Sequence, residues 1–163
     1  GLAAGPDRCL EAMEDSRVGA SGVQLSVVVL LLQFAALVRL GPLAPIALVL
    51  TSALARVSPL WAMARFAYLK VNGTAGFHRR HHKGLGDAVP TLILLLVLSP
   101  LLQRLPLLTA PLCLLSALVA AEWLGRRLGG MTGDSYGAVV MLSETSSLLF
   151  VALLAPSLGS AGG

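Results

Sequence analysis

The stretch that decides the fold is GGMTGDSYGA, which runs from Gly129 to Ala138 between two long apolar segments. It combines a high glycine content with a carboxylate, Asp134. A membrane protein tolerates irregular backbone near the bilayer only where that backbone is buried in protein or lines a site. We therefore expect a glycine-rich, site-forming loop over residues 125–136, joining two membrane helices.

The composition around this loop is that of a membrane protein. Of the 163 residues, 56% are hydrophobic and 12% charged, and the mean hydropathy is +0.82. Soluble domains carry roughly 25% charged residues. The aromatic content of 5% argues against a β-barrel, which carries aromatic girdles. The sequence predicts an all-α, polytopic integral membrane helical bundle that forms a single membrane domain over residues 1–163.

The apolar runs predict five membrane spans. They cover residues 18–38, 40–55, 88–103, 105–121 and 136–155. Residues 1–17 are expected to form a polar helix, and residues 56–87 a cytoplasmic or interfacial segment. A span of about 16 residues covers roughly 24 Å, less than the ~30 Å hydrocarbon core. Either flanking residues lengthen these spans or the bilayer thins locally.

The basic residues predict the orientation of the bundle. If the loops alternate between two sides, ten of the 12 Lys and Arg residues lie on one side, and only Arg39 and Arg104 on the other. The rich side is expected to be cytoplasmic. It holds the N-terminal segment, residues 56–87 and the glycine-rich loop, so the site is expected to face the cytoplasm. This placement explains the net charge of +4 through membrane lipid, without a nucleic-acid partner.

The glycine-rich loop is suited to bind phosphate and metal. Glycine lets backbone N–H groups approach an anion closely, Thr132 is suited to donate to phosphate, and Asp134 to bind Mg²⁺ through oxygen. The predicted phosphate-binding residues of the loop are Gly129, Gly130, Thr132, Gly133 and Gly137. The alternative is close helix packing, because these glycines include two G-x-x-x-G pairs.

Glu144 is a second candidate, since an ionisable residue inside an apolar run is by default a functional hypothesis. At about 100° per residue, the following side chains fall within an arc of roughly 80°: Asp134, Gly137, Met141 and Glu144. We predict Asp134 and Glu144 as catalytic residues, with Glu144 pairing with Arg126 or Arg127 or orienting substrate. The alternative is a paired structural carboxylate. Glu122 is the weaker candidate, because it can reach the interface.

Two basic positions complete the predicted site. Asp15, Ser16 and Arg17 precede the first span, and Arg17 is suited to hold a phosphate. The alternative for these residues is an ordinary helix end with anchoring charges. Arg56 begins a stretch that suits either an interfacial helix, anchored by Trp61, or a phosphate-binding strip.

The histidines and cysteines favour no metal site. His78, His81 and His82 stand among Arg79, Arg80 and Lys83, whose charges repel a metal ion. We expect a solvated basic loop attracted to anionic headgroups, with metal binding as the alternative. Cys9 and Cys113 are far apart and are expected to be structural.

Taken together, these motifs resemble the cobalamin synthase family, the adenosylcobinamide-GDP ribazoletransferases of bacteria and archaea. The resemblance covers nearly the whole chain. Its matching pieces are Met13-x-Asp15-Ser16-x-x-Gly19-x-x-Gly22, Arg56 with Trp61-Ala62-Met63, Gly73 with Gly76, Gly129-Gly130-x-Thr132-Gly133-Asp134-x-x-Gly137-Ala138, and Glu144.

The chain departs from the family pattern at its start. Family members carry an aspartate-rich motif ahead of the polar helix, and Gly1-Leu2 looks like its end. The resemblance therefore implies that the chain is the C-terminal part of a longer domain, that its main metal-binding aspartates are not assignable here, and that it is inactive alone. Some members also carry an acidic or amide residue at the position of Met141.

The resemblance implies a Mg²⁺-dependent transferase in a bacterial or archaeal cytoplasmic membrane. α-Ribazole, or its 5′-phosphate, attacks the β-phosphate of adenosylcobinamide-GDP, GMP leaves, and adenosylcobalamin or its 5′-phosphate forms. Asp134 would complete the metal shell, and Arg17 and Arg56 would hold phosphate oxygens. A second copy of the chain is a further candidate partner. The alternatives are another membrane phospho-alcohol transferase, a small transporter, and a scaffold without catalysis.

Overall fold

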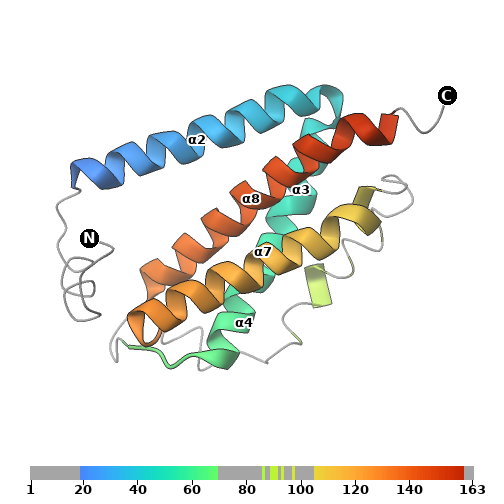
Figure 1. Cartoon of the computed structure of the whole chain (residues 1–163). Coiled ribbons are helices and arrows are strands. Elements are labelled where there is room, and N and C mark those ends of the chain that lie inside the picture. The colour runs from blue at the N-terminus through green and yellow to red at the C-terminus, as the bar shows by residue number, and fades with distance from the viewer. Residues whose placement is uncertain are drawn as a thin grey trace.

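The protein forms a bundle of α-helices, seen in a computed structural model that describes residues 19–69 and 105–159, with residues 86, 89–91, 93 and 97 between them (Figure 1). The helices are α2 (Ala20–Leu40), α3 (Ala44–Ala55), α4 (Val57–Arg65), α7 (Leu105–Leu128) and α8 (Gly133–Gly159), with a short 3₁₀ turn, η1 (Gly41–Leu43), after α2. The described residues form no β-strand, which confirms the predicted all-α fold. The expected polar helix over residues 1–17 and most of the expected span over residues 88–103 lie outside the described residues.

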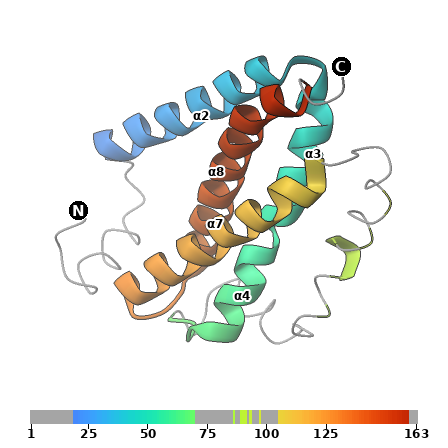
Figure 2. The same cartoon turned by 45° about the vertical axis from the view of Figure 1, so that its right-hand side comes forward.

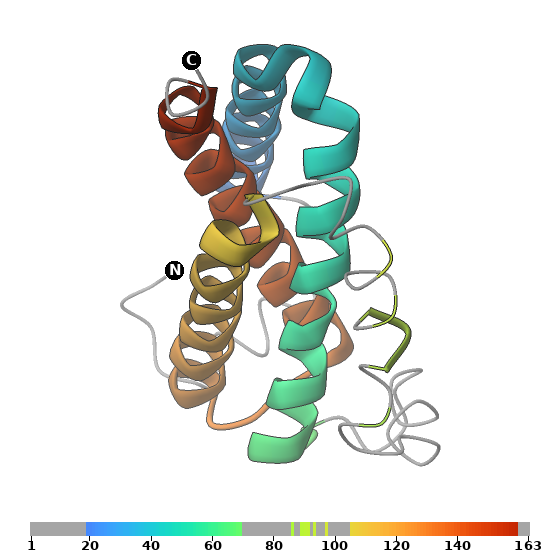
Figure 3. The ribbon, with the colours of Figure 1, turned by 90° about the vertical axis from the view of Figure 1, so that its right-hand side faces the viewer.

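The second span is longer than predicted. Helix α2 ends at Leu40 with Gly41 as its C-cap, and Pro42 and Pro45 lie in the first turns of η1 and α3, where proline is tolerated. Figure 3 shows α4 continuing along the line of α3. The run from Ala44 to Arg65 is roughly 33 Å long at 1.5 Å per residue, enough to cross the hydrocarbon core.

This continuity bears on the expected segment over residues 56–87. Its first residues, 57–65, form α4, which packs against both α7 and α8. The helical run therefore extends past the expected second span, as far as Arg65. Arg56 lies inside the long α3–α4 run and not at its end.

Helix α8 is the centre of the bundle. It packs against α2, α3, α4 and α7, and most extensively against α7 (Figures 1 and 2). One apolar cluster joins α2, α3, α7 and α8 and includes Leu50, Leu54, Cys113, Leu148 and Val151. A second cluster lies where α4, α7 and α8 meet near the Gly129–Thr132 turn, and includes Ala62, Ala121, Met131, Tyr136 and Val139.

Large apolar side chains are exposed along the described helices. Two helical stretches, Ala20–Arg65 and Gly133–Leu154, contain windows long and apolar enough to cross a membrane. Along α2, large side chains such as Leu25, Leu30 and Phe34 are 59–66% exposed. A face of this kind is expensive in water and suited to lipid.

The glycine-rich loop is shorter than predicted. Helix α7 continues to Leu128 and α8 begins at Gly133, so the expected loop over residues 125–136 is a turn of four residues. Gly125 lies within α7, where the helix packs closely against Phe66. A Cβ on Gly125 would lie 2.5 Å from the Phe66 ring. Close packing, and not a loop, accounts for this glycine.

Candidate functional site

The Gly129–Thr132 turn is held in place by the segment that follows α4. The Leu69 N–H donates to the Met131 carbonyl (2.9 Å), and the Met131 N–H donates to the Ala67 carbonyl (2.8 Å). These bonds make a single parallel bridge between Tyr68 and Met131. The turn is therefore fixed by contacts with residues more than sixty positions earlier in the chain.

The two glycines of the turn serve different purposes. Gly129 has φ +72°, the left-handed conformation in which glycine commonly ends a helix. Gly130 is needed for close approach, since a Cβ there would lie 2.7 Å from the Ala67 carbonyl oxygen and 2.6 Å from Leu69 Cδ2. Both glycines therefore shape the backbone of the turn, and their predicted phosphate contacts stay predictions.

Thr132 and Ser135 form a reciprocal cap on the first turn of α8. The Ser135 N–H donates to Thr132 Oγ1 (3.2 Å), and the Thr132 N–H donates to Ser135 Oγ (2.7 Å). Both side chains are fully buried. This cap gives Thr132 a structural role that the sequence analysis missed, although a Thr three residues before a Ser at the start of an apolar run resembles a capping box.

Two stacked tyrosines join the segment that follows α4 to helix α8. The Tyr68 and Tyr136 rings are parallel within 4°, with their centroids 6.3 Å apart. Tyr136 is only 7% exposed, and it belongs to the apolar cluster beneath the turn. The stack therefore packs the segment that follows α4 against the first turn of α8.

Asp134 is exposed in the first turn of α8. A negative charge is favourable at this helix end. Among the described residues no group of three or more His, Cys, Asp or Glu side chains comes together. The exposed Asp134 carboxylate is suited to supply a single oxygen ligand. Mg²⁺ binds in this way where substrate phosphates and water supply the remaining ligands.

The expected stripe along α8 is present, although it extends far from the turn. Asp134, Gly137 and Met141 are exposed and Glu144 is partly buried. Because α8 is continuous over these positions, Glu144 lies roughly 15 Å along the helix from Asp134. The stripe thus links two separate polar regions.

Glu144 belongs to the second of these regions, together with Arg56. The Ser52 hydroxyl donates to Glu144 Oε1 (2.5 Å), and Arg56 Nη1 donates to the Ser52 carbonyl (3.1 Å). Of the two expected partners of Glu144, Arg126 binds Glu122 instead, and pairing with Arg127 stays a prediction. Ser52 was missed, since nothing local in the sequence marks it as the partner of Glu144.

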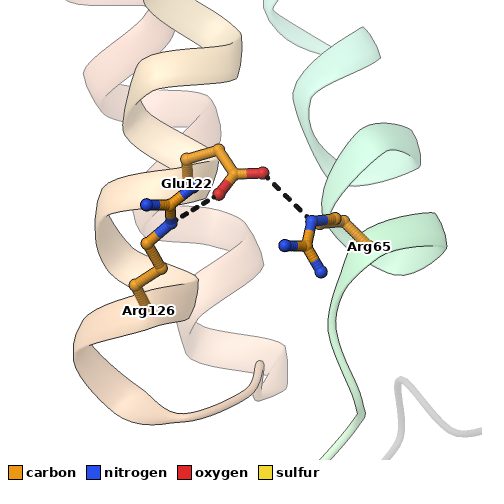
Figure 4. Close-up of polar contacts among 3 residues, drawn as sticks. All are labelled: Arg65, Glu122 and Arg126. Carbon is orange, nitrogen blue, oxygen red and sulfur yellow. Dashed lines mark hydrogen bonds and ion pairs between the residues drawn. The ribbon is translucent and has the colours of Figure 1, made fainter.

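Glu122 holds two arginines close to the turn (Figure 4). Arg126 Nε donates to Glu122 Oε2 (2.8 Å), and Arg65 Nε lies 3.4 Å from Glu122 Oε1. The Arg65 and Arg126 side chains are 54% and 73% exposed, whereas that of Glu122 is 25% exposed. We call Arg65, Glu122 and Arg126 the arginine cluster. The i, i+4 spacing of Glu122 and Arg126 in the sequence indicates their pairing, but nothing in the sequence indicates that Arg65 of α4 joins them.

Several expected features cannot be placed. Asp15, Ser16 and Arg17, as well as His78 to His82, lie outside the described residues. Cys113 is a free, buried thiol in the apolar core of α7, a position in keeping with its expected structural role.

Comparison with known proteins identifies the family. The family model described as cobalamin-5-phosphate synthase matches residues 1–152. Adenosylcobinamide-GDP ribazoletransferase of Prochlorococcus marinus strain MIT 9313 is 50% identical over 96% of this chain and 65% of its own length. The proteins of the same name from Prochlorococcus marinus strain MIT 9303 and Thermosynechococcus vestitus are 53% and 43% identical, over 94% and 89% of this chain.

These matches also show how much of each relative the chain covers. The chain spans just under two thirds of the length of the first two relatives, at 65% and 64%. No solved structure matches it. The family model nevertheless covers almost the whole chain, including the turn, the stripe and the arginine cluster. The chain belongs to the cobalamin-5-phosphate synthase family.

Proposed function

We propose that this chain is part of an adenosylcobinamide-GDP ribazoletransferase, which carries out a late step of cobalamin biosynthesis. The observation that carries the proposal is 50% identity, over 96% of the chain, to a protein of that name. The GG-x-TGD motif on which the resemblance rests forms a turn pinned by hydrogen bonds and a helix cap. A turn fixed in this way suits a reaction that depends on the precise placement of the reacting groups.

The proposed reaction is a phosphoryl transfer. An oxygen of α-ribazole, or of its 5′-phosphate, forms a bond to the β-phosphorus of adenosylcobinamide-GDP. The bond from that phosphorus to the oxygen of GMP breaks, and the product is adenosylcobalamin or its 5′-phosphate. Such transfers need placement and charge neutralisation more than covalent work by side chains. Bound Mg²⁺ would supply charge neutralisation at the phosphates, and Asp134 is the described carboxylate suited to hold it.

The protein is proposed to be multi-pass, with the turn on the cytoplasmic side of the membrane. Arg65 and Arg126 lie at the helix ends beside the turn. At the opposite end, Arg39 closes α2 and donates to the Ala152 carbonyl (2.9 Å). Basic residues gather on the cytoplasmic side of membrane proteins, which supports this orientation.

The test uses the protein from the complete reading frame, reconstituted in nanodiscs with Mg²⁺. Adenosylcobinamide-GDP and α-ribazole or its 5′-phosphate are supplied, and GMP and the corrinoid product are measured by chromatography. We expect turnover, and a loss of kcat on the order of 100-fold in Asp134→Asn, the size seen when a group that stabilises transition-state charge is removed.

Met141→Leu is the matched control, because it lies on the same exposed face of α8 and is expected to keep normal turnover. The proposal is overturned if the folded protein makes no corrinoid product. Turnover of a nucleotide-activated lipid alcohol in its place would identify another phospho-alcohol transferase. Normal turnover in Asp134→Asn would remove Asp134 from the site but would leave the activity in place.

A further inference from the structure

The arginine cluster beside the turn carries more positive charge than its carboxylate neutralises. Each oxygen of Glu122 faces the Nε atom of one arginine. Figure 4 shows the terminal nitrogens of Arg65, and one terminal nitrogen of Arg126, directed away from these contacts. Two guanidinium groups and one carboxylate leave a net charge of about +1, with outward N–H donors on both arginines.

A purely structural ion pair does not account for this arrangement. Exposed ion pairs contribute little to stability, and both arginine side chains are more than half exposed. One arginine would be enough to join α4 to α7 through Glu122. The Arg65 guanidinium also lies 5.4 Å from the centroid of the Phe66 ring, which further restricts its position. Glu122 therefore holds the two guanidinium groups in place without neutralising the charge of both.

The chemistry of the two guanidinium groups favours a phosphate ligand. Planar guanidinium groups bind phosphate oxygens through paired N–H bonds, which lysine cannot do. The cluster lies at the same end of the bundle as the pinned turn, because Arg65 precedes the segment of residues 67–69 and Arg126 is three residues before Gly129. The cluster and the turn therefore present donors on the same end of the molecule.

We propose that Arg65 and Arg126, held in place by Glu122, bind the phosphate groups of a nucleotide diphosphate at this end of the bundle. Arg65 and Arg126 contact the phosphates, and Glu122 is a positioning residue. The nucleotide part of this inference rests on the proposed function. Phosphate binding itself rests on the geometry and charge of the cluster alone.

The first experiment measures binding without turnover. Inorganic pyrophosphate and GDP are titrated onto the complete protein in nanodiscs of phosphatidylcholine, with calorimetric detection. We expect Arg65→Lys and Arg126→Lys each to weaken binding about tenfold, as for the loss of a charged hydrogen bond, and Glu122→Gln to weaken it by a smaller factor. Arg39→Lys, at the opposite end of the bundle, is the matched control and is expected to bind normally.

The second experiment separates a binding role from a structural one. In steady-state assays, we expect the two Arg→Lys variants to raise KM for the nucleotide substrate about tenfold and to change kcat less than about twofold. Lysine preserves the charge and the ion pair with Glu122, so a structural cluster would tolerate it. Unchanged KM and unchanged pyrophosphate binding in both variants would overturn the inference.

A lipid headgroup is the other source of phosphate. Nanodiscs that contain phosphatidylglycerol report on it, by native mass spectrometry of retained lipid. If the lysine variants lose phosphatidylglycerol but bind pyrophosphate normally, the inference is overturned. If the protein does not convert adenosylcobinamide-GDP but the variants still lose pyrophosphate, the proposed function fails and the phosphate site stands.

Discussion

Two polar regions of this apolar bundle use their polar groups in opposite ways. One is the mid-bundle polar layer, formed by Gln33, Ser52, Arg56, Ser116, Glu144, Thr145 and Ser147. The other is the turn end, formed by residues 65–69, Glu122, Arg126 and residues 129–136. In the layer, polar groups bind one another across helices: Gln33 donates to Thr145 (2.9 Å) and Ser52 to Glu144 (2.5 Å), and Ser116 lies 3.4 Å from Ser147.

At the turn end, the Met131 backbone and the Thr132 and Ser135 hydroxyl groups are paired within the chain, but the charged groups are not balanced. The turn and the cap use hydrogen bonds within the chain, whereas the arginine cluster keeps outward donors. A polar group paired across helices fixes helix register. A charged group held rigid but only partly neutralised is available for a ligand. We therefore expect a structural role for the layer, and we propose ligand binding at the turn end.

The largest expected effect tests whether the turn end depends on close backbone contact. We expect Gly130→Ala to destabilise the protein by about 2 kcal/mol, because its Cβ would overlap the Ala67 carbonyl and force the turn to shift. Thermal unfolding in detergent, followed by tryptophan fluorescence, measures the loss. Gly137→Ala is the control, since a Cβ there meets nothing within 4 Å. Equal stability of the two variants would show that the segment of residues 67–69 does not pin the turn.

A smaller effect is expected at the preceding glycine. Gly129→Ala places a side chain in the left-handed conformation, at a cost of about 1 kcal/mol. Gly129→Asn should lose less, because asparagine tolerates this conformation better. The same unfolding assay ranks the variants, and an asparagine variant no better than alanine would contradict the role of φ +72° in ending α7.

The smallest effect tests the layer. Ser52→Ala removes a hydrogen bond between α3 and α8, and bonds of this kind in membrane bundles contribute about 0.6 kcal/mol. Combining it with Glu144→Gln in a double-mutant cycle measures the coupling energy of the pair. We expect a measurable coupling energy between Ser52 and Glu144. We also expect the turnover of each variant to stay within about twofold of normal, because a group that contacts no substrate has little effect on kcat. Large loss of kcat at full stability in Glu144→Gln would erase the contrast between the two regions and support the predicted catalytic role of Glu144.

Much of this architecture follows from local features of the sequence. Apolar composition and helical periodicity predict an all-helical membrane bundle, and the structure confirms the all-α fold. The shared face of Asp134 and Glu144 depends only on the geometry of one helix, so it too was predictable. The bounds were less accurate: α4 and the last turns of α7 contain charged or small residues, and tertiary packing makes them helical.

The sequence by itself determined the class of the protein, its family resemblance, and the position of the glycine turn, because these depend on residues close together in the chain. Only the tertiary structure decided which distant residues meet. Helix packing brings residues 67–69 to Met131, Ser52 to Glu144, and Arg65 to Glu122. No local pattern encodes such contacts, since they depend on how whole helices pack, and they separate a paired polar layer from a charged end suited to bind phosphate.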